Sequence, residues 1–476
     1  MLIKDAEINA QRLDIRCQEQ KIVALGPQLT PLPGETVIAA GGGLLLPGLH
    51  DHHLHFHAWL AARQSLDCSP DKVRSAEALA ELLASAPSTG WLRGVGYRED
   101  VVGDLRHADL ERLCPGRPVR LQHSSGKMWL LNSTACDMLA LEQHHLDGIE
   151  RDTRGQVTGR LFRLDHWLGE QLRQASEPQT GTQTGRIAKD GTVPSDWQAA
   201  QQQLLAFGLT GFTDASYTNT AASTALFADL LPHCWLMGDE TLATGPLKIM
   251  LDEDRLPSLD SLVERIRAAH ARHRCVAFHC VTRVELVFLL AALQQAGVAD
   301  GDRIEHGAVI PPECIPQIRD AGLCVVTQPG FIAARGERFR RDVAEAEHAD
   351  LYRFASLLAA GITVVASSDA PYGPLNPWSI MHSAVTRQTE AGVALGLAEA
   401  VSPKQALAGY LTAPDHPGGP PRQLAVGQSA DLCLLRQNWM ELSAAGLDTA
   451  VVEYTVVDGE VAYANDANTA SVCSPS

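Results

Sequence analysis

The feature that most constrains the fold is a repeated alternation of short apolar runs with amphipathic stretches in the second half of the chain. Short strands, most of them apolar, are predicted at residues 275–279, 303–306, 323–327 and 362–369. Between and before them, apolar residues recur at three- and four-residue intervals, which predicts helices at 258–269, 284–293, 312–321 and 344–358. This alternation is typical of a parallel sheet covered by helices, so we expect an α/β fold.

The spacing favours a closed barrel. Lys248 and Asp369 are 121 residues apart, which fits four strand–helix units of about 30 residues each. His55 and Lys248 are 193 residues apart, where three such units need only about 90. We therefore expect a (β/α)8 TIM barrel over residues 48–414, with a large insertion within about 59–205. The Gln-, Thr- and Gly-rich loop 179–191 is expected to be its least ordered part.

Both ends of the chain have the pattern of β-structure. Strands are expected at residues 7–9, 13–17, 21–26, 430–435 and 455–463, the last interrupted by an Asp-Gly hairpin turn. We predict that residues 1–47 and 415–476 combine into one small β-sandwich domain. The tail from about Asn465 is expected to fray.

Composition excludes several kinds of partner. The chain has 39 Lys and Arg against 56 Asp and Glu, a formal net charge of −17, so neither nucleic acid nor an anionic membrane is an expected partner. The 11 cysteines are scattered singly, and we see neither an apolar signal core nor a run of membrane-spanning length. The expected location is therefore cytoplasmic. The oligomeric state stays open, a homo-oligomer included.

Five histidines fall between positions 50 and 57, directly after a Pro-Gly pair. Because side chains alternate along an extended chain, His53 and His55 should project to one face, and His50 and His52 to the other. Two imidazoles on one face at this spacing can bind one metal ion.

Later strands also end on polar residues, namely Lys248, His279, His306 and Asp369. In an α/β barrel the carboxyl ends of all strands meet at one face, where imidazole and carboxylate groups could bind zinc or a similar divalent metal. Each residue alone has a simpler explanation: a hydrogen-bonded core histidine, a helix N-cap for the aspartate, or a surface strand end for the lysine. Their shared order and spacing favour a metal site.

Together these motifs resemble those of the amidohydrolase superfamily, and within it the branch of N-substituted formamide deformylases. The matching segments are Pro47-Gly48-Leu49-His50-Asp51-His52-His53-Leu54-His55, Gly245-Pro246-Leu247-Lys248-Ile249, Phe278-His279, Ile304-Glu305-His306-Gly307, Ser367-Ser368-Asp369-Ala370-Pro371 and Gly427-Gln428-Ser429-Ala430-Asp431-Leu432. The resemblance spans nearly the whole chain.

The resemblance implies a centre of two divalent metal ions, with zinc the expected element. The implied ligands are His53 and His55 for one ion, His279 and His306 for the other, Asp369 near the first, and Lys248 as a bridge. Lys248 would react with carbon dioxide to become a carbamate, because an ammonium group cannot bind a cation. A metal-bridging hydroxide would then attack a carbonyl, with Asp369 as general acid and base.

The implied activity is hydrolysis of a non-peptide carbon–nitrogen bond in a small molecule: an amide, a formamide or a cyclic amide. A mononuclear deaminase is an alternative, but such relatives lack the lysine and carry a glutamate where this chain has Val281-Thr282. Ester or lactone hydrolysis would use the same chemistry. A ligand-binding scaffold is the non-enzyme alternative.

Two departures from the family lie where the substrate is expected. Lys127 stands where relatives often carry a histidine, and Cys280-Val281-Thr282-Arg283 replaces Ala-x-Gly-Asp-Arg. Lys127 and Arg283 are therefore candidate substrate contacts, Arg283 for a carboxylate, although a surface position is the simpler explanation for each. Candidate pocket walls are Trp59, Trp129, Phe331 and Trp378, with ordinary core packing as the alternative.

Overall fold

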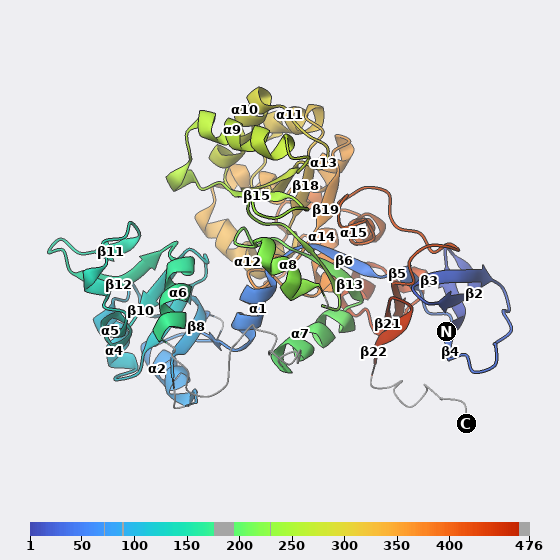
Figure 1. Cartoon of the computed structure of the whole chain (residues 1–476), viewed down its shortest axis with the longest axis horizontal. Coiled ribbons are helices and arrows are strands. Elements are labelled where there is room, and N and C mark those ends of the chain that lie inside the picture. Colours follow the sequence, from blue (N-terminus) through green and yellow to red (C-terminus); the bar gives the residue numbers. More distant parts are fainter. Residues whose placement is uncertain (71, 88–89, 176–194, 229, 466–476) are drawn as a thin grey trace. The chain divides into compact units, whose positions relative to one another are not determined.

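The computed structural model describes residues 1–70, 72–87, 90–175, 195–228 and 230–465 (Figure 1). The loop predicted at 179–191 and the tail beyond Asn465 lie outside these residues. The chain divides into two compact units, one of residues 1–56 with 187–476 and one of residues 57–186. No helix in the described part is long and apolar enough to cross a membrane.

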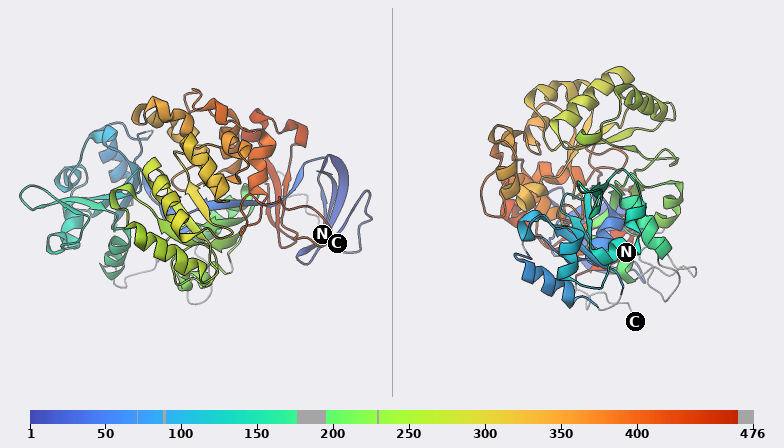
Figure 2. Two further views of the ribbon diagram at one scale, coloured as in Figure 1. Left: turned by 90° about the horizontal axis from the view of Figure 1, so that it is seen from above. Right: turned by 90° about the vertical axis from the view of Figure 1, so that its left-hand side faces the viewer.

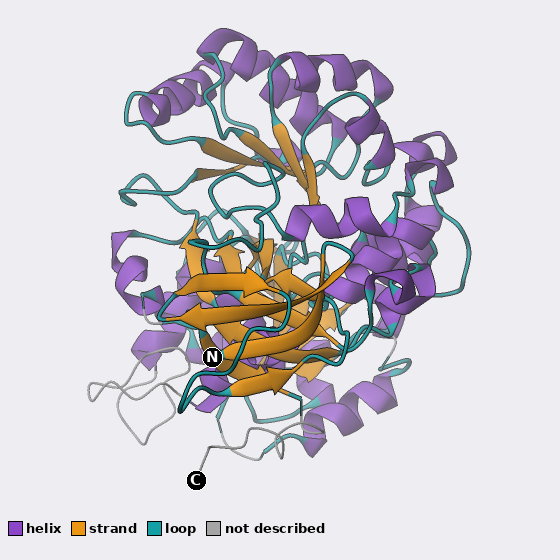
Figure 3. Ribbon diagram, turned by 90° about the vertical axis from the view of Figure 1, so that its right-hand side faces the viewer, coloured by secondary structure: helices purple, strands orange, loops and turns teal. Residues whose placement is uncertain are grey.

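Both chain ends contribute to a pair of sheets in the first unit (Figure 3). One has the order β3-β2-β1-β4, and the other β22-β21-β20-β5. The strands are β1 (Leu2–Ile8), β2 (Gln11–Gln18), β3 (Lys21–Gly26), β4 (Val37–Ala39), β5 (Leu45–Pro47), β20 (Leu432–Leu435), β21 (Val452–Val457) and β22 (Glu460–Ala464). Asp458 and Gly459 both have positive φ, as the predicted hairpin turn requires. The first strand begins at Leu2 rather than at residue 7.

Apolar side chains from both terminal sheets share one core. Ile3 and Ile15 from the N-terminal end pack in the same cluster as Leu432 and Val456 from the C-terminal end. Burial of these two faces against each other therefore joins segments more than 400 residues apart in sequence.

Truncation of this shared core should be costly. Leu432 is fully buried, so Leu432→Ala should lower the free energy of unfolding by about 2–5 kcal/mol, because it removes apolar contacts and leaves a cavity. Val426→Ala, at a position that is 61% exposed, is the control and should change little. Urea denaturation followed by circular dichroism measures both, and equal effects would contradict a common core.

The rest of the first unit contains two parallel sheets, ordered β14-β13-β6 and β15-β16-β17-β18-β19. The strands are β6 (Leu49–Leu54), β13 (Leu209–Asp214), β14 (His233–Leu236), β15 (Leu247–Met250), β16 (Val276–Cys280), β17 (Arg303–His306), β18 (Cys324–Thr327) and β19 (Val364–Ala366). Gly238 and Leu247 form a parallel bridge between the two sheets. At the other edge, the Asp369 N–H donates to the His53 carbonyl over 2.8 Å.

Helices follow most of these strands, as the alternation predicts. In Figure 1 helices α9, α10 and α11 lie together on one side of β15 and β18, and Figure 2 shows them in green-yellow to yellow from two further directions. The helices of this part are α7 (Ser195–Ala206), α8 (Ala221–Phe227), α9 (Leu259–His270), α10 (Arg283–Ala296), α11 (Ile315–Asp320), α12 (Gly330–Asp342), α13 (Ala355–Ala359), α14 (Pro377–Thr386), α15 (Pro403–Tyr410) and α16 (Ala444–Asp448).

The prediction of a single helix at 344–358 is wrong. The structure instead has α12 directly after β18, a 3-10 segment Glu345–Asp350, and the short α13. Tyr352 has a positive φ of 45°, which interrupts a right-handed helix. The Glu399 carboxylate accepts the Phe354 and Ser356 N–H groups, each over 2.9 Å, so tertiary hydrogen bonds override the local helical pattern.

The unit of residues 57–186 overlaps the interval in which the insertion is predicted. It has a six-stranded sheet of order β11-β12-β10-β9-β8-β7. Its elements are β7 (Leu66–Asp67), β8 (Leu92–Tyr97), β9 (Val119–His123), β10 (Met128–Leu131), β11 (Ile149–Arg151), β12 (Val157–Phe162), α2 (Ala76–Ser85), α3 (Glu99–Val102), α4 (His107–Leu113), α5 (Ser133–Met138) and α6 (Asp165–Ala175), preceded by α1 (Phe56–Arg63). Helix α7, also in the predicted interval, belongs to the first unit.

Candidate metal centre

The histidines of β6, together with His55 directly after it, point to two different sides, as the alternation predicts. His53 and His55 lie together, with ring centroids 5.3 Å apart. On the other side, Nε2 of His50 lies 2.9 Å from Oγ1 of Thr213, and Nε2 of His52 lies 2.9 Å from Oγ1 of Thr412. Of these histidines, only His53 and His55 are therefore available to a common ligand.

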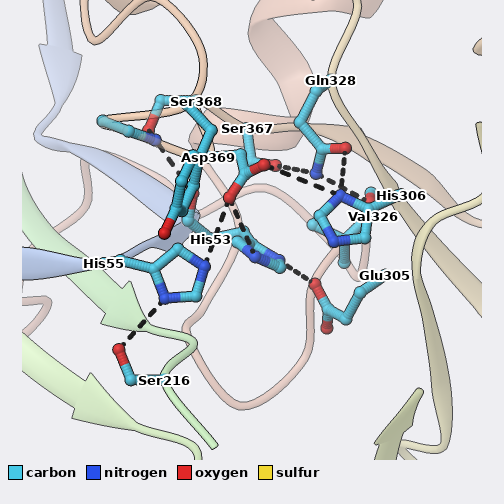
Figure 4. A network of polar contacts seen from close by, with 12 residues as sticks. His53, His55, Ser216, Glu305, His306, Val326, Gln328, Ser367, Ser368 and Asp369 are labelled. Atoms are coloured by element: carbon cyan, nitrogen blue, oxygen red, sulfur yellow. Dashed lines mark hydrogen bonds and ion pairs between the residues drawn. The ribbon is translucent and has the colours of Figure 1, made fainter. Parts of the chain in front are cut away.

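Asp369 completes a group of three (Figure 4). Its Oδ1 lies 3.5 Å from Nε2 of His53 and 3.3 Å from Nε2 of His55. One ligand atom from each of the three residues lies within 4.8 Å of the others, a spacing that a single metal ion can bridge. Asp369 has a positive φ of 53°, an uncommon conformation for a residue other than glycine, and the short bond from its N–H to the His53 carbonyl helps to hold it.

Three further predicted residues lie beside this group, on the neighbouring strands β15, β16 and β17. Nδ1 of His306 is 3.9 Å from Oδ2 of Asp369. The His306 ring lies 4.9 Å from that of His53 and 4.5 Å from that of His279, centroid to centroid. Lys248 is only 2% exposed and its charge interacts with those of His53 and Asp369. The structure therefore brings together all six residues that the sequence singles out.

Three buried polar atoms at this position lack a hydrogen-bond partner among the residues that the structure describes. Nε2 of His53, Oδ1 of Asp369 and Nζ of Lys248 are inaccessible to solvent and make no hydrogen bond within the described part of the chain. Buried polar atoms are nearly always satisfied in folded proteins, so a cluster of such atoms indicates an absent binding partner. Imidazole nitrogen and carboxylate oxygen are good ligands for a divalent metal ion.

Comparison with known families decides the class of protein. Residues 36–463 match the model of a family described as "Amidohydrolase family". The chain belongs to the amidohydrolase family. This amidohydrolase is therefore a metal-dependent hydrolase, as its resemblance implies, with His53, His55 and Asp369 as a candidate metal site.

Individual relatives are distant but cover almost the whole amidohydrolase. N-substituted formamide deformylase of Arthrobacter pascens is 26% identical, over 90% of both chains. The putative amidohydrolase YtcJ of Bacillus subtilis (strain 168) is 22% identical, over 90% of this chain and 91% of its own.

Solved structures share the fold. An uncharacterized metal-dependent hydrolase from Pyrococcus horikoshii OT3 has a TM-score of 0.70 and 18% identity, covering 93% of this chain and 99% of its own. A mutant of atrazine chlorohydrolase TrzN from Arthrobacter aurescens TC1, complexed with zinc and atraton, has a TM-score of 0.50 and 15% identity. The match covers 98% of this chain and 95% of the TrzN chain.

The electrostatics of the site favour the neutral form of His53, His279 and His306. Burial, with the nearby Lys248 charge, lowers the pKa of His53 to about 3, and burial also lowers the pKa of His279 and His306. Neutral imidazole is the form that binds a metal. Burial alone would raise the pKa of Asp369, but its contact with His55 holds that pKa well below its usual range. All these groups are therefore in their metal-binding forms.

Each of three histidines is held through its second ring nitrogen (Figure 4). Nδ1 of His53 contacts the Glu305 carboxylate, Nδ1 of His55 lies 3.0 Å from Oγ of Ser216, and Nδ1 of His306 lies 2.9 Å from Oε1 of Gln328. The other Glu305 oxygen accepts a hydrogen bond from Nε of Arg303 over 2.7 Å. Partners of this kind orient metal-binding imidazoles.

These supporting residues were not predicted to be functional. Glu305 offered one signal, because a carboxylate in the middle of a short buried strand needs a specific partner. Asp51 is a second supporting residue, because its Oδ1 accepts the His53 and Ser368 N–H groups over 3.1 and 3.2 Å. It thus ties β6 to the segment that carries Asp369.

Glu305→Gln is expected to weaken metal binding. The amide of glutamine is a weaker acceptor for Nδ1–H of His53, so the affinity for zinc should fall about 10- to 100-fold. Competition with a fluorescent chelator measures the affinity. Glu337→Gln, at an exposed carboxylate on α12, is the matched control. An unchanged zinc affinity in Glu305→Gln would show that this contact does not support the centre.

The predicted substrate contacts occupy varied surroundings. Phe331 on α12 is buried, and Arg283 at the start of α10 is exposed and paired with Glu313. Trp378 is buried and donates through Nε1 to the carbonyl of Phe207, just before β13 begins, which is a core position.

The remaining three candidates belong to the unit of residues 57–186. Trp59 lies on α1 and Lys127 is exposed in the turn before β10. Trp129 on β10 is buried and donates through Nε1 to Oδ1 of Asp165 over 2.7 Å. Contact of these residues with a substrate stays a prediction.

Proposed function

We propose that this amidohydrolase is a binuclear metal-dependent enzyme that hydrolyses a non-peptide carbon–nitrogen bond in a small amide, formamide or cyclic amide. His53 and His55 would hold one divalent ion and His279 and His306 the other, with Asp369 beside the first. Lys248, as a carbamate, would bridge the two ions. Zinc is the proposed metal, supported by the zinc in the related TrzN structure.

The observation that carries this proposal is the buried Lys248 amine. It lies among the predicted metal ligands with no hydrogen bond from any described residue. Burial lowers the pKa of this amine, although the Glu305 carboxylate opposes the shift. The lowered pKa increases the fraction of neutral amine, the form that reacts with carbon dioxide. Addition of carbon dioxide to this amine, with release of one proton, would give a carbamate anion whose two oxygens could bind divalent cations.

The architecture supports the same proposal. We infer that β6, β13, β14 and β15–β19 close into one eight-stranded barrel within residues 48–414, since contacts join the two parallel sheets at both edges. Residues 1–47 and 415–476 would form the composite sandwich domain. The carboxyl ends of β6, β15, β16 and β17 then place the candidate ligands at the catalytic face of the barrel.

In this proposal Asp369 moves the proton. Its ionised carboxylate takes a proton from the attacking water and passes it to the leaving nitrogen. A bound divalent metal ion would lower the pKa of water and polarise the substrate carbonyl. The hydrogen bond to Ser216 fixes the ring of His55, and that from Asp369 N–H to the His53 carbonyl fixes the base against β6.

The name of the Arthrobacter pascens relative, N-substituted formamide deformylase, supports an amide or formamide substrate. A deaminase is less well supported. Glu285, an acidic residue shortly after His279, directs its carboxylate to the N–H groups of Glu253, Val281 and Thr282. It therefore acts as a structural cap of α10.

A substrate screen with metal control tests the proposed function. Zinc-loaded protein should release amine or ammonia from at least one member of a panel of N-substituted formamides, N-acyl amino acids, hydantoins and ureas. Chelation should abolish the release and zinc should restore it. Absence of any turnover at full zinc occupancy would favour the ligand-binding scaffold instead.

A further inference from the structure

Arg335 occupies an unusual place for an arginine. It lies on α12, the helix that begins just after the carboxyl end of β18. Its side chain is half-buried, and its guanidinium carbon lies 4.2 Å from the centroid of the Phe331 ring. Its Nη2 donates to the carbonyl of Tyr372. The guanidinium is thus held on an aromatic surface rather than extended into solvent.

Tyr372 connects this guanidinium to the metal centre. The Tyr372 N–H donates to the Asp369 carbonyl over 2.8 Å, and its ring lies edge-on to that of His55, with centroids 5.7 Å apart. The Asp369 charge also acts on Arg335: burial lowers the pKa of this arginine, and Asp369 partly opposes that shift. Arg335 therefore borders the site that contains the proposed reacting groups.

No carboxylate forms an ion pair with Arg335 among the residues that the structure describes. The other arginines of α12 are all paired: Arg338 and Arg341 with Asp342, and Arg340 with Glu337. The charge of Asp369 acts on Arg335, but Asp369 is a candidate ligand of the metal ion and is therefore not the counter-ion of Arg335. A half-buried cation without a counter-ion offers a favourable binding position for an anion.

We propose that Arg335 binds a carboxylate of the substrate, and that the preferred substrates are amides with a carboxylate close to the scissile bond. This inference rests on the proposed function. The planar guanidinium can donate two parallel hydrogen bonds to a carboxylate, which orients the substrate as well as binding it. Phe331 beneath it would hold the guanidinium in place for this contact. Arg283, exposed and already paired with Glu313, is a weaker candidate for this role.

Two compounds that differ only in the carboxylate test the inference: N-formylphenylalanine and N-formylphenethylamine. The zinc-loaded wild type should prefer the first. Arg335→Gln should lower kcat/KM for N-formylphenylalanine about 10- to 100-fold, mainly through KM, and leave the neutral compound within about threefold. For N-formylphenylalanine, the kcat/KM of Arg335→Lys should lie between those of the wild type and Arg335→Gln. Lysine keeps the positive charge but cannot donate two parallel hydrogen bonds. Arg340→Gln, on the same helix, should behave as wild type.

Other results would overturn the inference. Equal loss for both compounds in Arg335→Gln would mean that Arg335 only supports the segment around Asp369. Equal turnover of the two compounds by the wild type would be consistent with the proposed function but would refute a carboxylate-binding role for Arg335. If neither compound is hydrolysed, calorimetry with N-acetylphenylalanine and N-acetylphenethylamine decides. Binding of the first that depends on Arg335 supports the site without hydrolysis, and binding independent of Arg335 refutes it.

Discussion

Replacement of Lys248 with alanine is expected to abolish hydrolysis, with kcat lowered at least about 10³-fold. The reason is that the chain would lose the only proposed anionic bridge between the two metal ions. Because the Lys248 amine makes no hydrogen bond with the described residues, its removal should leave the thermal midpoint of the metal-free protein unchanged or slightly raised. If Lys248 had only a structural role, its replacement should instead lower the thermal midpoint of the metal-free protein.

A rescue experiment makes the Lys248 result specific. Acetate or propionate, added at high concentration to Lys248→Ala with zinc, should restore part of the activity by supplying the missing carboxylate. Lys404→Ala, on the exposed surface of α15, is the matched control and should be unaffected. Full activity of Lys248→Ala without any added acid would refute the bridging role.

Asp369→Asn is the second substitution with a large expected effect. It removes the proposed proton acceptor while keeping the size of the side chain, so kcat should fall about 10²- to 10⁴-fold. Affinity for the metal held by His53 and His55 should also weaken, since a charged ligand becomes neutral. Asp300→Asn, at a carboxylate that is 96% exposed, serves as the control. Retention of more than a tenth of the wild-type kcat would assign the proton transfer to another group.

The candidate centre could be predicted because its residues stand out individually. His279, His306 and Asp369 lie at the ends of predicted strands, and the barrel expectation explains why residues so distant in sequence meet. The projection of His53 and His55 to the same side follows from the alternation of side chains along a strand alone. The strand predicted at 303–306 has the observed ends, Arg303 and His306.

What could not be predicted depends on tertiary contacts. Helix α12 is rich in arginine and poor in apolar residues, so it was not predicted as a helix, and Arg335 was missed with it. Residues 344–358 do not form one helix, because the carboxylate of Glu399, more than 40 residues away, accepts the N–H groups of Phe354 and Ser356. The roles of Glu305 and Gln328 likewise depend on which histidine each reaches in the folded chain.

The most direct test of the binuclear centre is the metal content of the pure protein. Elemental analysis by mass spectrometry, after reconstitution with zinc and removal of the excess, should give about two ions per wild-type chain. Lys248→Ala should retain about one or fewer under the same treatment. About one ion per wild-type chain would indicate a mononuclear enzyme, and no tightly bound ion would contradict the metal centre itself.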